Sequence, residues 1–94
     1  MVSLSEQYNK SKLKNTVTDP EEWIVYLEIL QTRLAGMSYD ITDRHLMIHI
    51  MHNLPPEYDS VVEDLEKSLD HPSTPLTIET VRYRLHAKWE RMNR

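Results

Sequence analysis

Three histidines have the spacing that most resembles a chemical site. His45, His49 and His52 stand at i, i+4 and i+7, which would align three imidazoles along one side of a helix and could hold zinc. Leu46 occupies the place of the glutamate general base of helical zinc peptidases. A fourth ligand is hard to name, because the chain has no cysteine and no carboxylate supports the three histidines. We therefore expect a solvated polar face, with no metal and no cofactor.

Other catalytic patterns are missing from the sequence. It has no glycine-rich phosphate loop, no nucleophile elbow and no cysteine nucleophile, and its 15 acidic residues are spread over helical surfaces. We expect a protein that is not an enzyme and takes no small-molecule substrate.

Length and composition limit the classes of protein that remain. The 94 residues fit one domain, residues 1–94, with a single small core. A cysteine-free chain suits a reducing compartment, and the longest apolar run, Leu46-Met47-Ile48, is far too short to span a bilayer. We expect an intracellular, cytoplasmic protein with no membrane contact. The net charge of −4 argues against strong nucleic-acid binding by this segment alone.

Start and stop signals divide the chain into helices. Asp19-Pro20, Thr42-Asp43 and Thr77 are N-terminal signals, and Gly36 is predicted to end a helix in the left-handed conformation. No apolar alternation typical of a strand persists. We predict an all-α bundle of four to five helices, spanning residues 20–35, 43–53, 56–69 and 77–92, with a possible short helix in residues 1–16. The predicted core is Trp23, Leu27, Leu30, Leu34, Leu46, Ile50, Val62, Leu65, Leu85 and Trp89.

The order of these features resembles the copia-type LTR retrotransposon Gag family. Its most specific part is Leu54-Pro55-Pro56-Glu57-Tyr58-Asp59, followed after a loop by Leu76-Thr77-Ile78-Glu79. The resemblance, which covers roughly residues 13 to 91, implies a capsid segment with a fold similar to the retroviral capsid C-terminal domain. It also implies homodimerisation or higher assembly within a virus-like particle.

Two departures from that pattern limit what the resemblance carries over. Tyr26 stands where retroviral capsid domains have a hydrogen-bonding arginine. The zinc knuckle that binds RNA in many Gag proteins needs cysteines, so any such RNA contact would lie outside this chain.

Two apolar faces are candidates for self-association. Val25 and Ile29 project from nearly the opposite side of helix 20–35 to its main stripe, so either the first segment, through Leu4, Tyr8 and Leu13, or a partner subunit must cover them. Helix 43–53 turns a second set of residues outward, and the resemblance implies that this helix pairs two-fold. The full predicted interface is Val25, Ile29, Ile41, Arg44, His45, Ile48 and His52.

Two consequences test pairing through helix 43–53. Ile48→Asp is expected to shift the dimer toward monomer. Protonation of His45 and His52 in mild acid would bring like charges together across the interface.

The main alternative is RNA contact through the basic C-terminal helix. Arg84, Lys88 and Arg91 share one helical face and could touch phosphates, although solvation or attraction to the acidic segment 57–70 is the favoured explanation of these charges. A domesticated Gag-derived protein that binds a partner's peptide between its helices is a third hypothesis.

Overall fold

The computed structural model describes residues 3–94, which form five α-helices and one short 3-10 helix. Their bounds are α1 (Leu4–Lys10), α2 (Pro20–Ala35), α3 (Asp43–His52), η1 (Pro56–Tyr58), α4 (Asp59–Ser68) and α5 (Ile78–Met92). Residues 3–94 contain no strand, so the predicted all-α bundle is confirmed. None of the helices in these residues is long and apolar enough to cross a membrane.

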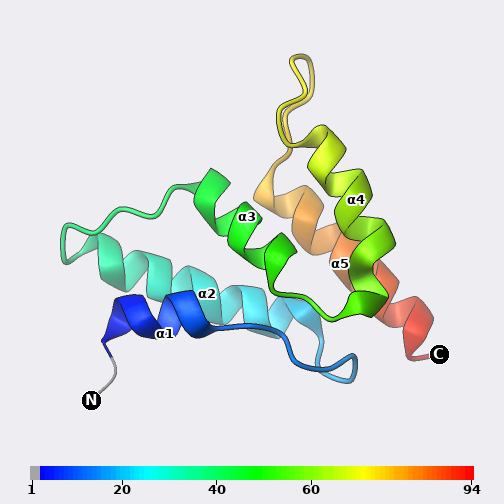
Figure 1. Cartoon of the computed structure of the whole chain (residues 1–94), viewed down its shortest axis with the longest axis horizontal. Helices are drawn as coiled ribbons and strands as arrows, with labels where there is room; N and C mark the ends of the chain where they lie inside the picture. Colours follow the sequence, from blue (N-terminus) through cyan, green and yellow to red (C-terminus); the bar gives the residue numbers. More distant parts are fainter. Residues whose placement is uncertain (1–2) are drawn as a thin grey trace.

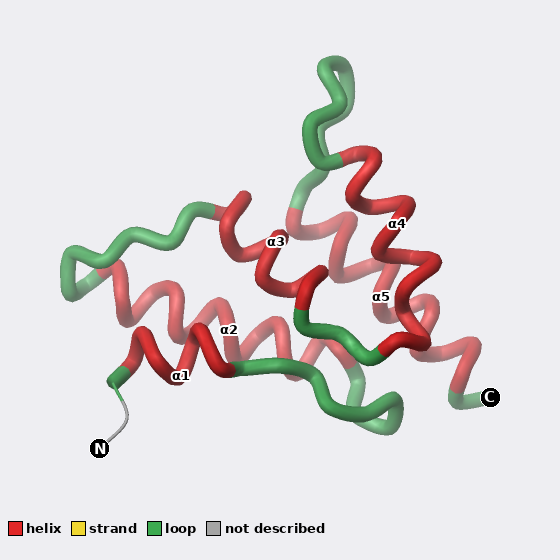
Figure 2. The backbone as a smooth tube through the Cα atoms, viewed as in Figure 1, coloured by secondary structure: helices red, strands yellow, loops and turns green. Residues whose placement is uncertain are grey.

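The helices are arranged in two layers. In Figure 1, α1, α3 and α4 lie in front, and α2 and α5 lie behind them. The shortest dimension of the molecule is 17 Å, against 38 and 34 Å for the other two, as expected for two stacked helices separated by ~8–10 Å. Figure 2 shows the loop between α4 and α5 projecting away from both layers.

Three helices begin where the capping signals predict. The Asp19 side chain accepts a hydrogen bond from the Glu21 amide at 2.9 Å, and Pro20 occupies the first helical position of α2. Thr42 and Thr77 cap α3 and α5 in the same way. These caps satisfy amide groups that would otherwise lack partners at the helix ends.

The end of α2 differs from the prediction. Gly36 has φ −64°, within the right-handed helical region, and the left-handed residue is Ser38 with φ 62°. The Tyr39 amide donates to the Leu34 carbonyl at 2.9 Å, and the Ser38 amide donates to the Ala35 carbonyl at 3.0 Å. This is a Schellman motif with Ser38 at its left-handed position. The prediction placed the turn two residues too early because only Gly36 matched the usual residue preference.

The possible short helix in residues 1–16 is present as α1, which ends at Lys10, and residues 1 and 2 lie outside the described residues. The Asn15 side-chain oxygen accepts from the Val17 and Thr18 amides at 3.0 and 2.9 Å, an Asx-type turn that competes with helix. The same segment is tied to α5, because the Trp89 indole donates to the Val17 carbonyl at 3.0 Å.

Eight of the ten predicted core residues are buried. The other two, Val62 and Trp89, are partly buried at the edge of the core. Ile24 and Val81 are completely buried, although neither is in the predicted core list. Ile24 joins Leu27 and Leu34 because α2 is covered by α1, α3 and α5 together. Packing on several sides widens the buried stripe beyond the one that a single neighbour requires.

Candidate interaction surfaces

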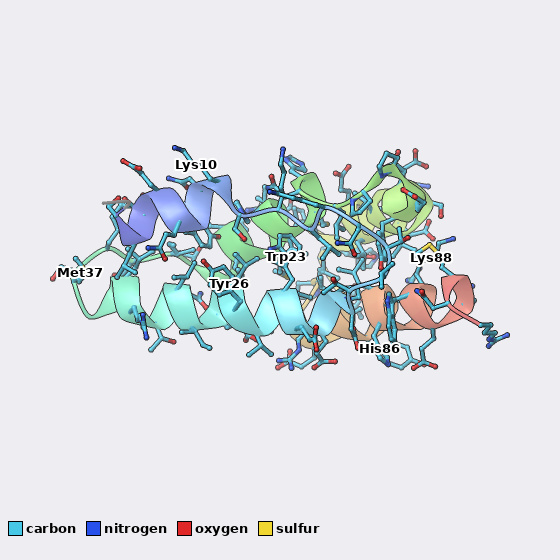
Figure 3. All side chains as sticks on the ribbon, turned by 90° about the horizontal axis from the view of Figure 1, so that it is seen from below. Lys10, Trp23, Tyr26, Met37, His86 and Lys88 are labelled. Atoms are coloured by element: carbon cyan, nitrogen blue, oxygen red, sulfur yellow. The ribbon has the colours of Figure 1, made fainter. Side chains whose placement is uncertain are left out.

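The outer side of α2 keeps a set of apolar side chains in solvent. Val25, Tyr26 and Ile29 are 41%, 43% and 49% exposed. Val25 and Ile29 also line a shallow depression with Thr32 and Arg33. In Figure 3, Trp23 lies between the two layers, and Tyr26 lies about one turn further along the same helix. We call the exposed side of α2 the α2 outer face.

The first segment does not cover Val25 and Ile29, which both remain exposed, so the first of the two alternatives is wrong. Helix α1 does pack against α2, and Tyr8 and Leu13 are buried, but they contact the core side of α2. The reason is that α1 also packs on α3: the Tyr8 ring stacks on the His49 ring with centroids 4.5 Å apart. Helix α1 therefore lies in the front layer with α3, and both helices pack on α2.

A groove of about 600 Å³ lies between α1, α3 and the loop joining α2 to α3. It brings together four of the predicted interface residues, Ile41, His45, Ile48 and His52, with Tyr8 and Tyr39. His45 and His52 are exposed, and Ile48 is half-buried. No sequence pattern points to Tyr39, because it belongs to a loop and reaches the groove only through the packing of α1 against α3.

Two predicted interface residues have other roles. Ile41 is 8% exposed and belongs to the core, so the prediction that it faces solvent is wrong. The Gln31 amide donates to the Ile41 carbonyl at 2.8 Å, which holds the loop against α2 and carries the Ile41 side chain inward. Arg44 is paired with Asp70 within the chain; the hydrogen bond from Arg44 lowers the pKa of Asp70 and the same contact raises the pKa of Arg44.

One wall of the groove is fixed by a hydrogen-bonded cluster. The Trp23 indole donates to the Ser11 hydroxyl at 2.8 Å, and His49 Nε2 lies 2.9 Å from the Ser11 carbonyl, to which it donates. Burial lowers the pKa of His49, partly offset by this hydrogen bond, so the ring is neutral at neutral pH. Burial and, secondly, Tyr39 raise the pKa of Tyr8 to about 12.

The three histidines do not converge on one point. His49 Nε2 contacts the Ser11 carbonyl, whereas His52 Nε2 lies 3.6 Å from a Glu66 carboxylate oxygen on α4. Within residues 3–94, no group of three or more metal-ligating side chains is placed to hold an ion.

The predicted basic face of α5 is divided. Arg84 lies 3.3 Å from Asp64 on α4, so the acidic and basic helices contact each other through this ion pair. Lys88 is half-buried and Arg91 is exposed. Arg84, Arg91 and Arg94 nevertheless line one shallow surface depression with Tyr83 and Glu90. The three residues proposed for RNA contact therefore have unequal exposure, and one of them is already paired.

A comparison of the chain with protein-family models, curated proteins and solved structures gave no match.

Proposed function

We propose that this domain is a structural self-assembly module that binds copies of itself, in the manner of a Gag capsid segment, and performs no catalysis. The observation that carries the proposal is the exposure of Val25, Tyr26 and Ile29 on one side of α2. Adjacent exposed apolar side chains mark interaction sites more often than isolated ones do. The copia-type pattern around Pro55-Pro56 supports the same function.

Two separate surfaces also favour assembly over simple dimerisation. The α2 outer face lies in the back layer, and the groove beside Ile48 opens between α1, α3 and the loop joining α2 to α3. A module with one self-complementary surface closes at a dimer, whereas two different surfaces allow continued growth. A shell requires two different contact surfaces on each copy.

The proposal is tested by sedimentation velocity of the purified domain over a concentration series. We expect the wild type to self-associate reversibly and Ile29→Asp to weaken association, because a buried unpaired carboxylate opposes contact. Val17→Asp is the matched control, since Val17 is equally apolar and 76% exposed but lies in the loop before α2. A wild type that remains monomeric at every concentration would contradict self-assembly.

RNA contact is the competing function, and ionic strength separates the two. Binding through Arg84, Lys88 and Arg91 predicts an RNA gel shift that weakens steeply as salt increases, because phosphate contacts release counterions. Self-assembly alone predicts no shift at physiological salt. The Arg84–Asp64 pair supports the second outcome, because it already neutralises one of the three cations.

A further inference from the structure

The α2 outer face contains a stripe of four residues with alternating spacing. Glu22, Tyr26, Ile29 and Arg33 follow one another at intervals of four, three and four, and all four are exposed. This spacing keeps side chains in line along a helix and is that of the contact seam between paired helices. The stripe is ~16 Å long, which is three helical turns.

The stripe is complementary to its own copy when two helices run in opposite directions. The midpoint between Glu22 and Arg33 coincides with the midpoint between Tyr26 and Ile29. A two-fold axis through that point places Glu22 opposite Arg33 of a second copy and Tyr26 opposite Ile29. Symmetry repeats each contact, so two ion pairs would flank a central apolar cluster.

The charges at the ends of the stripe are available for such pairing. Glu21 and Glu28 are occupied, since their carboxylates bind Arg82 of α5 at 2.5 and 3.2 Å. Glu22 and Arg33 have no ion-pair partner among residues 3–94. The helix dipole favours an acid at the first turn and a base at the last, and the same arrangement makes the ends of two antiparallel helices attract.

We infer that two copies of this chain pair through antiparallel α2 helices, with Glu22 bound to Arg33 of the second copy at both ends. The inference rests on the proposed self-assembly and specifies its surface, symmetry and register. A parallel arrangement would place Glu22 against Glu22 and Arg33 against Arg33, which is repulsive. Charge therefore selects the antiparallel pair.

The test is charge reversal followed by mixing, measured by sedimentation velocity at low ionic strength, ~0.01–0.1 M, where screening is weak. Glu22→Arg and Arg33→Glu should each raise the dimer Kd at least ~10-fold, because each creates two like-charged contacts. An equimolar mixture of these two variants should dimerise within ~3-fold of the wild type, since both contacts are attractive again. The double variant Glu22→Arg with Arg33→Glu should dimerise equally well.

Controls and outcomes keep this inference separate from the proposed function. Glu63→Arg and Lys67→Glu make the same charge changes on exposed positions of α4 and should leave the dimer unchanged. Circular dichroism checks that each variant folds, and recovery on mixing requires that both do. A wild type that never associates overturns both proposals. In the Ile48→Asp background, where the groove contact is blocked, association that survives both single reversals, or is not recovered on mixing, overturns the α2 pairing alone.

Discussion

Tyr8 and Tyr58 bury their hydroxyl groups without a hydrogen-bond partner among residues 3–94. Tyr58 is completely buried, and desolvation raises its pKa to about 12, with smaller contributions from Asp19 and Glu57. A buried hydroxyl without a partner loses its hydration without compensation, at ~1–3 kcal/mol. Both hydroxyls therefore oppose folding, whereas their rings contribute apolar contact.

Tyr58→Phe is expected to leave the free energy of unfolding unchanged or to increase it by up to ~1 kcal/mol, because it removes the unpaired group and keeps the ring. Urea denaturation measures this difference. Tyr83→Phe is the matched control, since Tyr83 is 73% exposed and its hydroxyl is hydrated. A clear loss of stability in the Tyr58 variant alone would show that the hydroxyl has a partner.

His49 makes folding sensitive to acid. Burial lowers its pKa below the ordinary value of 6.5, so the unfolded chain binds a proton more readily than the folded chain does. The stabilisation that follows from this difference is fully present above pH 6.5 and is lost as pH falls toward the folded pKa. Stability measured between pH ~7 and ~5 should decline less in His49→Gln than in the wild type; an identical decline would refute this role. His45→Gln, on the exposed side of α3, serves as the control.

His86 acts in the opposite sense. Its Nδ1 lies 3.1 Å from an Asp19 carboxylate oxygen and its Nε2 lies 2.5 Å from Glu90. The hydrogen bond to Asp19, followed by weaker effects of both carboxylates, raises the pKa of His86. This contribution to stability is present below pH 6.5 and is lost as pH rises through the folded pKa. His49 and His86 therefore change the free energy of unfolding in opposite directions as pH falls. Substituting each histidine in turn separates the two effects.

In the C-terminal turn of α2, glycine occupies a helical position, where other residues are favoured, and serine occupies a left-handed position, where glycine is favoured. Gly36 is helical, and Ser38 is left-handed. A Cβ on Gly36 would meet the Arg33 carbonyl oxygen at 3.4 Å, an ordinary contact. A helical glycine costs ~0.5–1 kcal/mol relative to alanine, and a left-handed non-glycine residue costs ~1–2 kcal/mol.

Gly36→Ala and Ser38→Gly should therefore each increase the free energy of unfolding, by ~0.5–1 kcal/mol. Thermal denaturation of the two single variants and the combined variant measures the effect. Gly36→Ala should not change self-association, because the turn lies beyond Arg33. Destabilisation by Ser38→Gly would contradict the left-handed assignment.

At the scale of the whole molecule, the proposed assembly uses two different surfaces, the α2 outer face and the groove beside Ile48. Antiparallel α2 pairing closes at a dimer, so growth toward a shell needs the second surface. In this arrangement Ile48→Asp is predicted to stop assembly at the dimer, whereas pairing through α3 alone predicts a monomer.

Light scattering at high concentration tests this division. The wild type should form species larger than a dimer, Ile48→Asp should remain dimeric, and Ile48→Asp combined with Glu22→Arg should be monomeric. Monomeric Ile48→Asp with a dimeric Glu22→Arg variant would instead make α3 the primary pairing helix.

The sequence by itself determined the helix starts, the helix order and most of the core. Asp19, Thr42 and Thr77 act on amides two or three residues away, and the apolar period is a property of one helix, so both are readable locally. Glu22, Tyr26, Ile29 and Arg33 also carried a readable seam spacing. This spacing indicates a contact surface only when no other segment of the chain covers the four residues.

Only the tertiary structure decided which faces remain in solvent. Ile41 is buried because Gln31 holds its loop, and Arg44 is paired because Asp70 lies beside it. Val25 and Ile29 stay exposed because α1 and α3 both pack on the other side of α2. These outcomes depend on contacts between segments ten or more residues apart in the chain. A local pattern states that a face is apolar, whereas the packing of distant segments determines whether the protein or a second copy buries it.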